Sequence, residues 1–104
     1  MTKVMFTELN SGILFECRGH AGDRNVCAGV SALCIALAEK LRELDDERAA
    51  KINSMSVSGG EVAIEAEWDD TYGEAIVKTV FDTVRKGFER IEEMYPENLR
   101  CETA

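Results

Sequence analysis

Apolar residues in this chain switch between two spacings, and the order of the switches restricts the fold. Residues 3–8 and 12–18 are short runs rich in β-branched and aromatic residues, and Asn10-Ser11-Gly12 between them is typical of a hairpin turn. From residue 26 to about residue 48 the apolar positions recur at steps of three and four, with charged residues between them. The first half of the chain therefore predicts two antiparallel strands followed by an amphipathic helix.

The second half repeats this pattern. Residues 52–58 and 61–68 alternate apolar and polar side chains around Gly59-Gly60, which indicates a second hairpin. An apolar stripe with helical spacing then runs from Val77 to Tyr95 and stops at Pro96, a residue type that ends helices. We predict the order ββαββα, an α+β fold in which a mostly antiparallel sheet packs against two helices.

Length and charge limit the classes of function. The 104 residues, 45% of them apolar, suit a single domain spanning residues 1–104. The formal net charge of −8 repels phosphate and anionic lipid, so it disfavours direct binding to nucleic acid or a membrane and favours a basic protein partner. The N-terminus lacks the apolar run of a signal peptide and no segment approaches a membrane span, so we expect a cytoplasmic protein with reduced cysteines.

The polar loop between the second strand and the first helix is flanked by two residues with reactive side chains. His20, the only histidine, stands where the strand ends, and Cys27 stands in the first turn of the helix. The six residues between them span far more than a thiol and an imidazole need to meet. We therefore predict that His20 and Cys27 come together at the edge of the sheet.

This placement suits a cysteine nucleophile. A cysteine attacks as the thiolate, and both the positive end of a helix dipole and a nearby imidazolium favour that form. Backbone N–H groups of Cys27 and Ala28 are expected to be unpaired at the helix start, where they could stabilise an oxyanion. Asp23 and Asn25 are candidates either to orient His20 or to cap the helix, and the sequence leaves that choice open.

The other cysteines fit structural positions better. Cys34 falls in the middle of the helix, Cys17 faces inward on its strand, and Cys101 lies in a polar tail after Pro96. The spacing of Cys17 and His20 gives one C-x-x-H pair, but no second close pair and no C-x-x-C motif accompanies it. We expect no metal and no cofactor.

Two short motifs carry a family resemblance. Gly19 to Ala21 read GHA and Val26 to Leu33 read VCAGVSAL, and the C-terminal segment Ile91 to Arg100 reads IEEMYPENLR. Together they resemble the ribosomal-processing cysteine proteases of the Prp family. The resemblance implies a cysteine protease with His20 as base and Cys27 as nucleophile. It also implies a homodimer that removes an N-terminal extension from large-subunit ribosomal protein twenty-seven, a basic substrate that suits an acidic protein.

The chain departs from the family pattern between the two dyad residues. Family members typically have a longer, glycine-containing loop there, with an aspartate shortly before VCA, whereas this chain has AGDRNV, which places Arg24 where that aspartate falls by direct count. A shorter loop also suits an alternative, a non-catalytic acidic module that holds a basic ribosomal protein tail without cutting it.

Overall fold

The computed structural model describes all 104 residues, which form five strands and two helices. In chain order these are β1 (Thr2–Glu8), β2 (Gly12–Arg18), α1 (Arg24–Asp46), β3 (Lys51–Ser58), β4 (Glu61–Glu67), α2 (Thr71–Met94) and β5 (Leu99–Thr103). The predicted ββαββα order is confirmed, and a fifth strand follows it.

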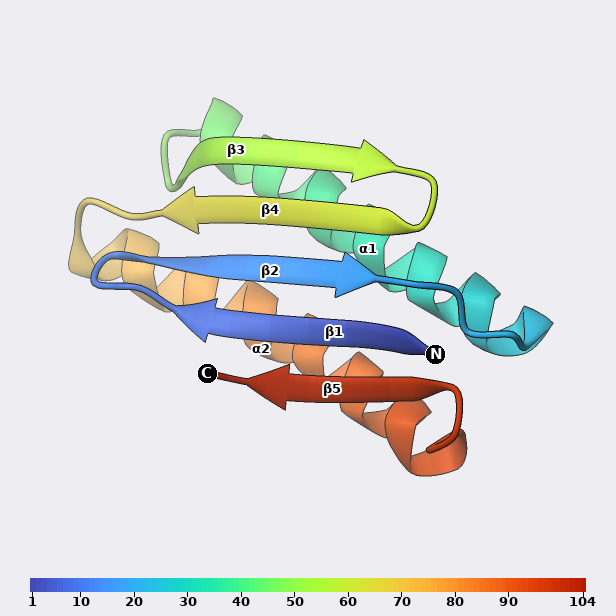
Figure 1. Ribbon diagram of the computed structural model, residues 1–104. Coiled ribbons are helices and arrows are strands. Elements are labelled where there is room, and N and C mark those ends of the chain that lie inside the picture. Colours follow the sequence, from blue (N-terminus) through green and yellow to red (C-terminus); the bar gives the residue numbers. More distant parts are fainter.

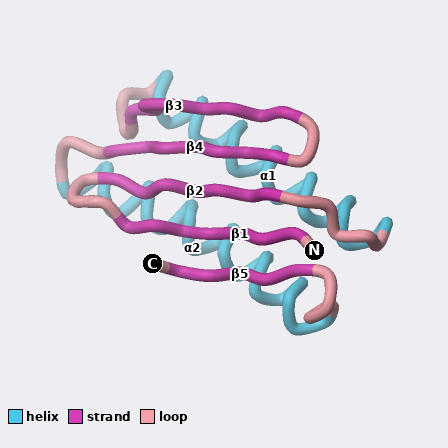
Figure 2. Tube along the Cα trace, viewed as in Figure 1, coloured by secondary structure: helices cyan, strands magenta, loops and turns pink.

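The molecule has two layers, a single sheet and a pair of helices on one of its faces (Figure 1). The strands lie in the order β3-β4-β2-β1-β5, so β5 is the edge strand beside β1 (Figure 2). All neighbours are antiparallel except β1 and β5, which are parallel. The mostly antiparallel α+β architecture predicted from the sequence is confirmed.

Aromatic rings form the centre of the core between sheet and helices. Phe6 and Phe15, opposite each other on β1 and β2, have ring centroids 5.1 Å apart. Phe88 of α2 stacks on Phe15 at 5.7 Å, and Phe81 of the same helix meets Phe6 edge-on at 6.4 Å. These four side chains are buried, so α2 is fixed against the middle of the sheet.

Both helices begin where an aspartate caps them. Asp23 precedes α1 and Asp70 precedes α2, and each carboxylate accepts hydrogen bonds from backbone N–H groups of the first turn. Because Asp23 caps it, α1 starts at Arg24, two residues before the predicted start at residue 26, and it ends at Asp46. Both helices are amphipathic, and neither is long and apolar enough to cross a membrane.

The fifth strand corrects the prediction of a polar tail. Cys101 lies half-buried in β5, opposite Val4 of β1. Its N–H donates a 3.0 Å hydrogen bond to the Glu92 carboxylate of α2, which satisfies a donor of this edge strand. Five mostly polar residues carry little strand pattern even after the turn at Pro96–Asn98, so this element depends on pairing with β1.

Candidate active site

A hollow of about 500 Å³ lies between the first turns of α1 and the turn that joins β3 to β4. Residues of α1, of the β3–β4 hairpin and of the ends of β1 and β2 line it: Thr2, Cys17, Gly19, His20, Cys27, Val30, Ser31, Cys34, Ile35, Val57, Ser58, Gly59, Gly60, Glu61 and Val62. His20 and Cys27 both belong to this set. The structure thus brings the two predicted residues to one hollow.

His20 is exposed and lies against the β3–β4 turn. A Cβ atom added to Gly60 would lie 3.3 Å from both Cε1 and Nε2 of the imidazole, tighter than most side-chain contacts. Gly60 also has a φ of +83°, a conformation that favours glycine. A residue 40 positions along the chain therefore forms one wall against which the imidazole rests. The sequence analysis identified this glycine only as part of a turn.

Cys27 is the fourth residue of α1 and the only exposed thiol in the protein. Its side chain borders the hollow that His20 also borders, yet no hydrogen bond joins the two side chains. Catalytic hydrogen bonds are often long before substrate binds, so the absence of a hydrogen bond between His20 and Cys27 is compatible with a dyad.

The backbone around Cys27 corrects the expected oxyanion donors. The N–H of Cys27 donates a 3.0 Å hydrogen bond to the Asp23 carbonyl, the first bond of the helix. The N–H groups without intrahelical partners are those before Cys27, and Ala28 lies beyond them inside the helix. Because the helix starts two residues earlier than predicted, neither Cys27 nor Ala28 offers a free donor at the helix start.

Asp23 acts as the helix cap. Its Oδ1 accepts hydrogen bonds from the N–H groups of Asn25 at 2.9 Å and Val26 at 3.1 Å. The Asn25 side chain is exposed and makes no hydrogen bond within the protein, so nothing in its contacts links it to His20. Of the two alternatives left open for Asp23, the structure shows capping.

The remaining thiols are protected. Cys17 and Cys34 are buried at the floor of the hollow, as the sequence predicts. Interaction with Cys17 together with burial raises the pKa of the Cys34 thiol. Burial and the nearby carboxylates of Glu89 and Glu92 raise the pKa of Cys101 to about 11. Interaction with Cys34 lowers the pKa of Cys17, but Cys17 is buried, so Cys27 is the one thiol exposed to a substrate.

The loop that carries His20 is held by distant parts of the chain. Gly19 donates its N–H to the Gly60 carbonyl at 3.0 Å, and its own carbonyl accepts a 3.5 Å hydrogen bond from the hydroxyl of the buried Thr2. The Asn98 amide donates a 2.7 Å bond to the Ala21 carbonyl. Sequence reasoning missed these anchors, although the segment that contains Asn98 had been singled out by its resemblance.

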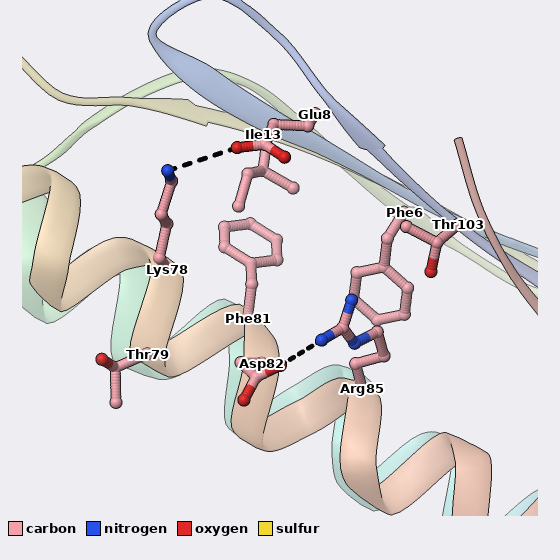
Figure 3. Close-up of a pocket in the computed structure, with 9 residues that line it drawn as sticks. All are labelled: Phe6, Glu8, Ile13, Lys78, Thr79, Phe81, Asp82, Arg85 and Thr103. Carbon is pink, nitrogen blue, oxygen red and sulfur yellow. Dashed lines mark hydrogen bonds and ion pairs between the residues drawn. The ribbon is translucent and has the colours of Figure 1, made fainter.

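A second hollow, of about 440 Å³, lies at the opposite end of the strands, over Phe6 and Phe81 (Figure 3). Its charged groups form ion pairs: Lys78 pairs with Glu8 at 3.3 Å, and Arg85 pairs with Asp82, although Arg85 Nε is buried without a hydrogen-bond partner. It holds neither a cysteine nor a histidine, and no cluster of three or more ligating side chains suited to a metal occurs in the protein. The candidate active site is therefore the hollow at His20 and Cys27.

Comparison with known protein families agrees with this geometry. A family model described as the cysteine protease Prp matches residues 1–100, nearly the whole chain. The chain belongs to the Prp family. The chemistry of this family is peptide hydrolysis by a cysteine, and the enzyme class predicted from the sequence is confirmed.

Solved structures share the Prp fold of this chain. A ribosomal processing protease Prp from Staphylococcus aureus, crystallised with a covalently linked product peptide, is 23% identical with a TM-score of 0.71, and 100% of each chain is covered. SMU.848 from Streptococcus mutans is 20% identical with a TM-score of 0.69 over 99% of this chain and 93% of the other. The S. aureus protease with a substrate peptide is 18% identical, with a TM-score of 0.63 over 100% of both chains. A comparison with curated proteins finds no match.

Proposed function

We propose that this Prp family member cleaves peptides with Cys27 as nucleophile and His20 as general base and acid. The observation that carries the proposal is that the one exposed thiol and the one histidine border the same hollow. The other three thiols are buried or half-buried. No other pair of side chains in the hollow combines an exposed thiol with an imidazole.

The reaction follows the usual course of a cysteine protease. His20 accepts the proton of the Cys27 thiol, and the thiolate sulfur attacks the peptide carbonyl to form a tetrahedral oxyanion. The C–N bond then breaks as His20 gives the proton to the leaving amine, which leaves an acyl group on Cys27 as a thioester. Water, deprotonated by His20, hydrolyses that thioester and frees both the second product and the thiol.

Oxyanion stabilisation falls to the N–H groups of Asp23 and Arg24. Both belong to the last turn before Cys27, and neither makes a hydrogen bond within the protein. Side chains on a helix lean toward its N-terminus, so the Cys27 sulfur lies over this turn, and the positive end of the helix dipole lies there too. These two donors replace Cys27 and Ala28 in the proposal.

The substrate we propose is large-subunit ribosomal protein twenty-seven, cut to remove its N-terminal extension. Relatives of the same fold are described as ribosomal processing proteases and were crystallised with substrate and product peptides. The net charge of −8 favours a basic ribosomal protein, and Val30, Ile35 and Val57 give the hollow apolar walls beside Cys27. We propose that the enzyme works in the cytoplasm as a homodimer.

The test is cleavage of the host's own ribosomal protein twenty-seven, with its extension, by wild type, Cys27→Ala and His20→Ala. Mass spectrometry of the products should show a single cut by wild type. Cys27→Ala should lose on the order of 10⁴-fold or more in kcat, because no other thiol reaches the hollow as an exposed nucleophile.

The matched control is Cys101→Ala, which removes a thiol of raised pKa outside the hollow and should retain wild-type cleavage. Cleavage at the same bond by Cys27→Ala would contradict the assigned nucleophile. An intact extension after prolonged incubation, with binding of the substrate demonstrated, would contradict the assigned substrate and favour a binding role for the acidic surface.

A further inference from the structure

We infer that Asn98 is a positioning residue for the active site: its side-chain amide holds the loop that carries His20 at a fixed place relative to Cys27. The inference rests on the His20 and Cys27 dyad proposed above. It gives a role to the C-terminal segment from Ile91 to Leu99, which lies outside the hollow and takes no part in the chemistry.

Asn98 is itself firmly held. Its N–H donates to the Tyr95 carbonyl at 3.0 Å, and its carbonyl accepts from the N–H of Thr2 at 2.9 Å. The next residue, Leu99, is fully buried at the start of β5. The backbone of Asn98 is thus tied to the end of α2 and to the start of β1, which makes its side chain a rigid donor.

The loop depends on that donor. Ala21 is buried between two residues with positive φ, Gly19 at +92° and Gly22 at +76°. The bond from Asn98 Nδ2 to the Ala21 carbonyl, 2.7 Å long, is the only hydrogen bond that His20, Ala21 and Gly22 make with the rest of the protein. Glycines on either side leave the backbone free to turn, so loss of this bond releases the residue next to the imidazole.

The same segment also fixes the helix that carries Cys27. A Cβ on Gly29 of α1 would lie 3.1 Å from Cδ1 of Ile91, so the two helices are in close contact one half-turn after Cys27. Ile91 sets the position of the cysteine helix and Asn98 sets the position of the histidine loop. Two residues seven positions apart in one segment therefore control the separation of the two catalytic groups.

The substitution Asn98→Ala should lower kcat by about 10- to 100-fold with little change in KM, because a misplacement of about 1 Å at a catalytic group costs rate rather than binding. Asn98→Asp fills the same space but has no donor and faces the Ala21 carbonyl with an oxygen, so it should lose at least as much. Asn53→Ala is the matched control, since its amide bonds the exposed Glu65 carboxylate at 3.0 Å, away from the hollow.

The deciding measurement is the rate of Cys27 alkylation by iodoacetamide from pH 5 to pH 9, read by mass spectrometry on folded protein. Wild type and His20→Ala define the profiles with and without the imidazole. Asn98→Ala and Asn98→Asp should move toward the His20→Ala profile, while Asn53→Ala should follow wild type. Thermal unfolding of each variant separates this effect from loss of fold.

The outcomes are distinguishable. If both Asn98 variants remain folded and keep the wild-type alkylation profile and kcat, Asn98 does not position the site, although the dyad stands. If wild type and His20→Ala have the same profile and the same kcat, the dyad itself is wrong, and the role of Asn98 fails with it. Should Asn98→Ala fail to fold, the comparison rests on Asn98→Asp, which preserves the side-chain volume.

Discussion

The two ends of the strands differ in how their polar groups are satisfied. At the far end, Lys78 pairs with Glu8 and Arg85 pairs with Asp82, and Arg85 Nε is buried without a hydrogen-bond partner (Figure 3). The carboxylates of Glu74 and Glu8 raise the pKa of Lys78. At the active-site end, the thiol of Cys27 and the imidazole of His20 are exposed and make no hydrogen bond with each other.

The two ends are therefore held in place by different kinds of contact. The far end is held by ion pairs between side chains, one of which joins α2 to β1. The active-site end leaves its side chains free for substrate and is instead held through its backbone, by Thr2, Gly60 and Asn98. We expect substitutions at the far end to change stability alone, and substitutions at the site end to change reactivity as well.

The largest effect on stability should come from Phe81→Ala at the far end. Phe81 is buried and meets Phe6 edge-on, so its truncation should cost about 3 to 5 kcal/mol in the free energy of unfolding. Denaturant unfolding measures the loss, and Cys27 alkylation in the folded fraction should stay at the wild-type rate. An altered alkylation rate would show that the two ends are coupled.

Gly60→Ala should lower both the stability of the fold and the reactivity of Cys27. Its φ of +83° costs an alanine about 1 to 2 kcal/mol, and the new methyl group would press on the His20 imidazole. We expect slower Cys27 alkylation and lower kcat beyond what the stability loss explains. Gly59→Ala is the control, because nothing lies within 4 Å of a Cβ there. Equal behaviour of the two variants would argue against contact with His20 as the cause.

Asp23→Ala should cost about 1 kcal/mol through loss of the helix cap. Asp70→Ala removes the corresponding cap of α2 and should cost a similar amount. Because Asp23 caps the helix rather than orients His20, Asp23→Ser should restore both stability and kcat. A kcat that stays low in Asp23→Ser, with stability regained, would instead assign the carboxylate a direct role at the imidazole.

The last effect is absent at neutral pH and appears only on the alkaline side of the stability profile. The pKa of Cys101 is raised to about 11 in the folded protein from an ordinary value of 9.0. The stability contributed by its neutral thiol is therefore fully present below pH 9 and is lost as the pH rises toward 11. Between pH 8 and pH 11, the free energy of unfolding should fall less steeply with pH in Cys101→Ala than in wild type. A slope identical to that of wild type would show that this thiol is solvated in the native state.

Local patterning predicted most of the fold and part of the site. Alternation and helical spacing gave both hairpins and both helices, because those elements bury one face each. The same reasoning placed His20 and Cys27 around one loop. It missed β5, whose stability comes from pairing with β1. It also placed the start of α1 two residues too late, and so expected a free N–H at Cys27, which instead bonds the Asp23 carbonyl.

What the sequence could not supply are contacts between distant residues. Gly60 rests against His20 across a hairpin turn, and Asn98 reaches Ala21 from 77 residues away. Neither contact follows from spacing or composition, since each depends on how the sheet and helices pack. The C-terminal motif pointed to the right segment without saying what it touches.

The bond between Asn98 and Ala21 also has a consequence for the timing of maturation. A ribosome makes the histidine loop early and the asparagine 77 residues later, and chains fold from the N-terminus as they emerge. A nascent chain that already contains His20 and Cys27 still lacks Asn98, the residue that we infer to align them. Translation therefore delivers the proposed nucleophile well before the residue that we infer to align it.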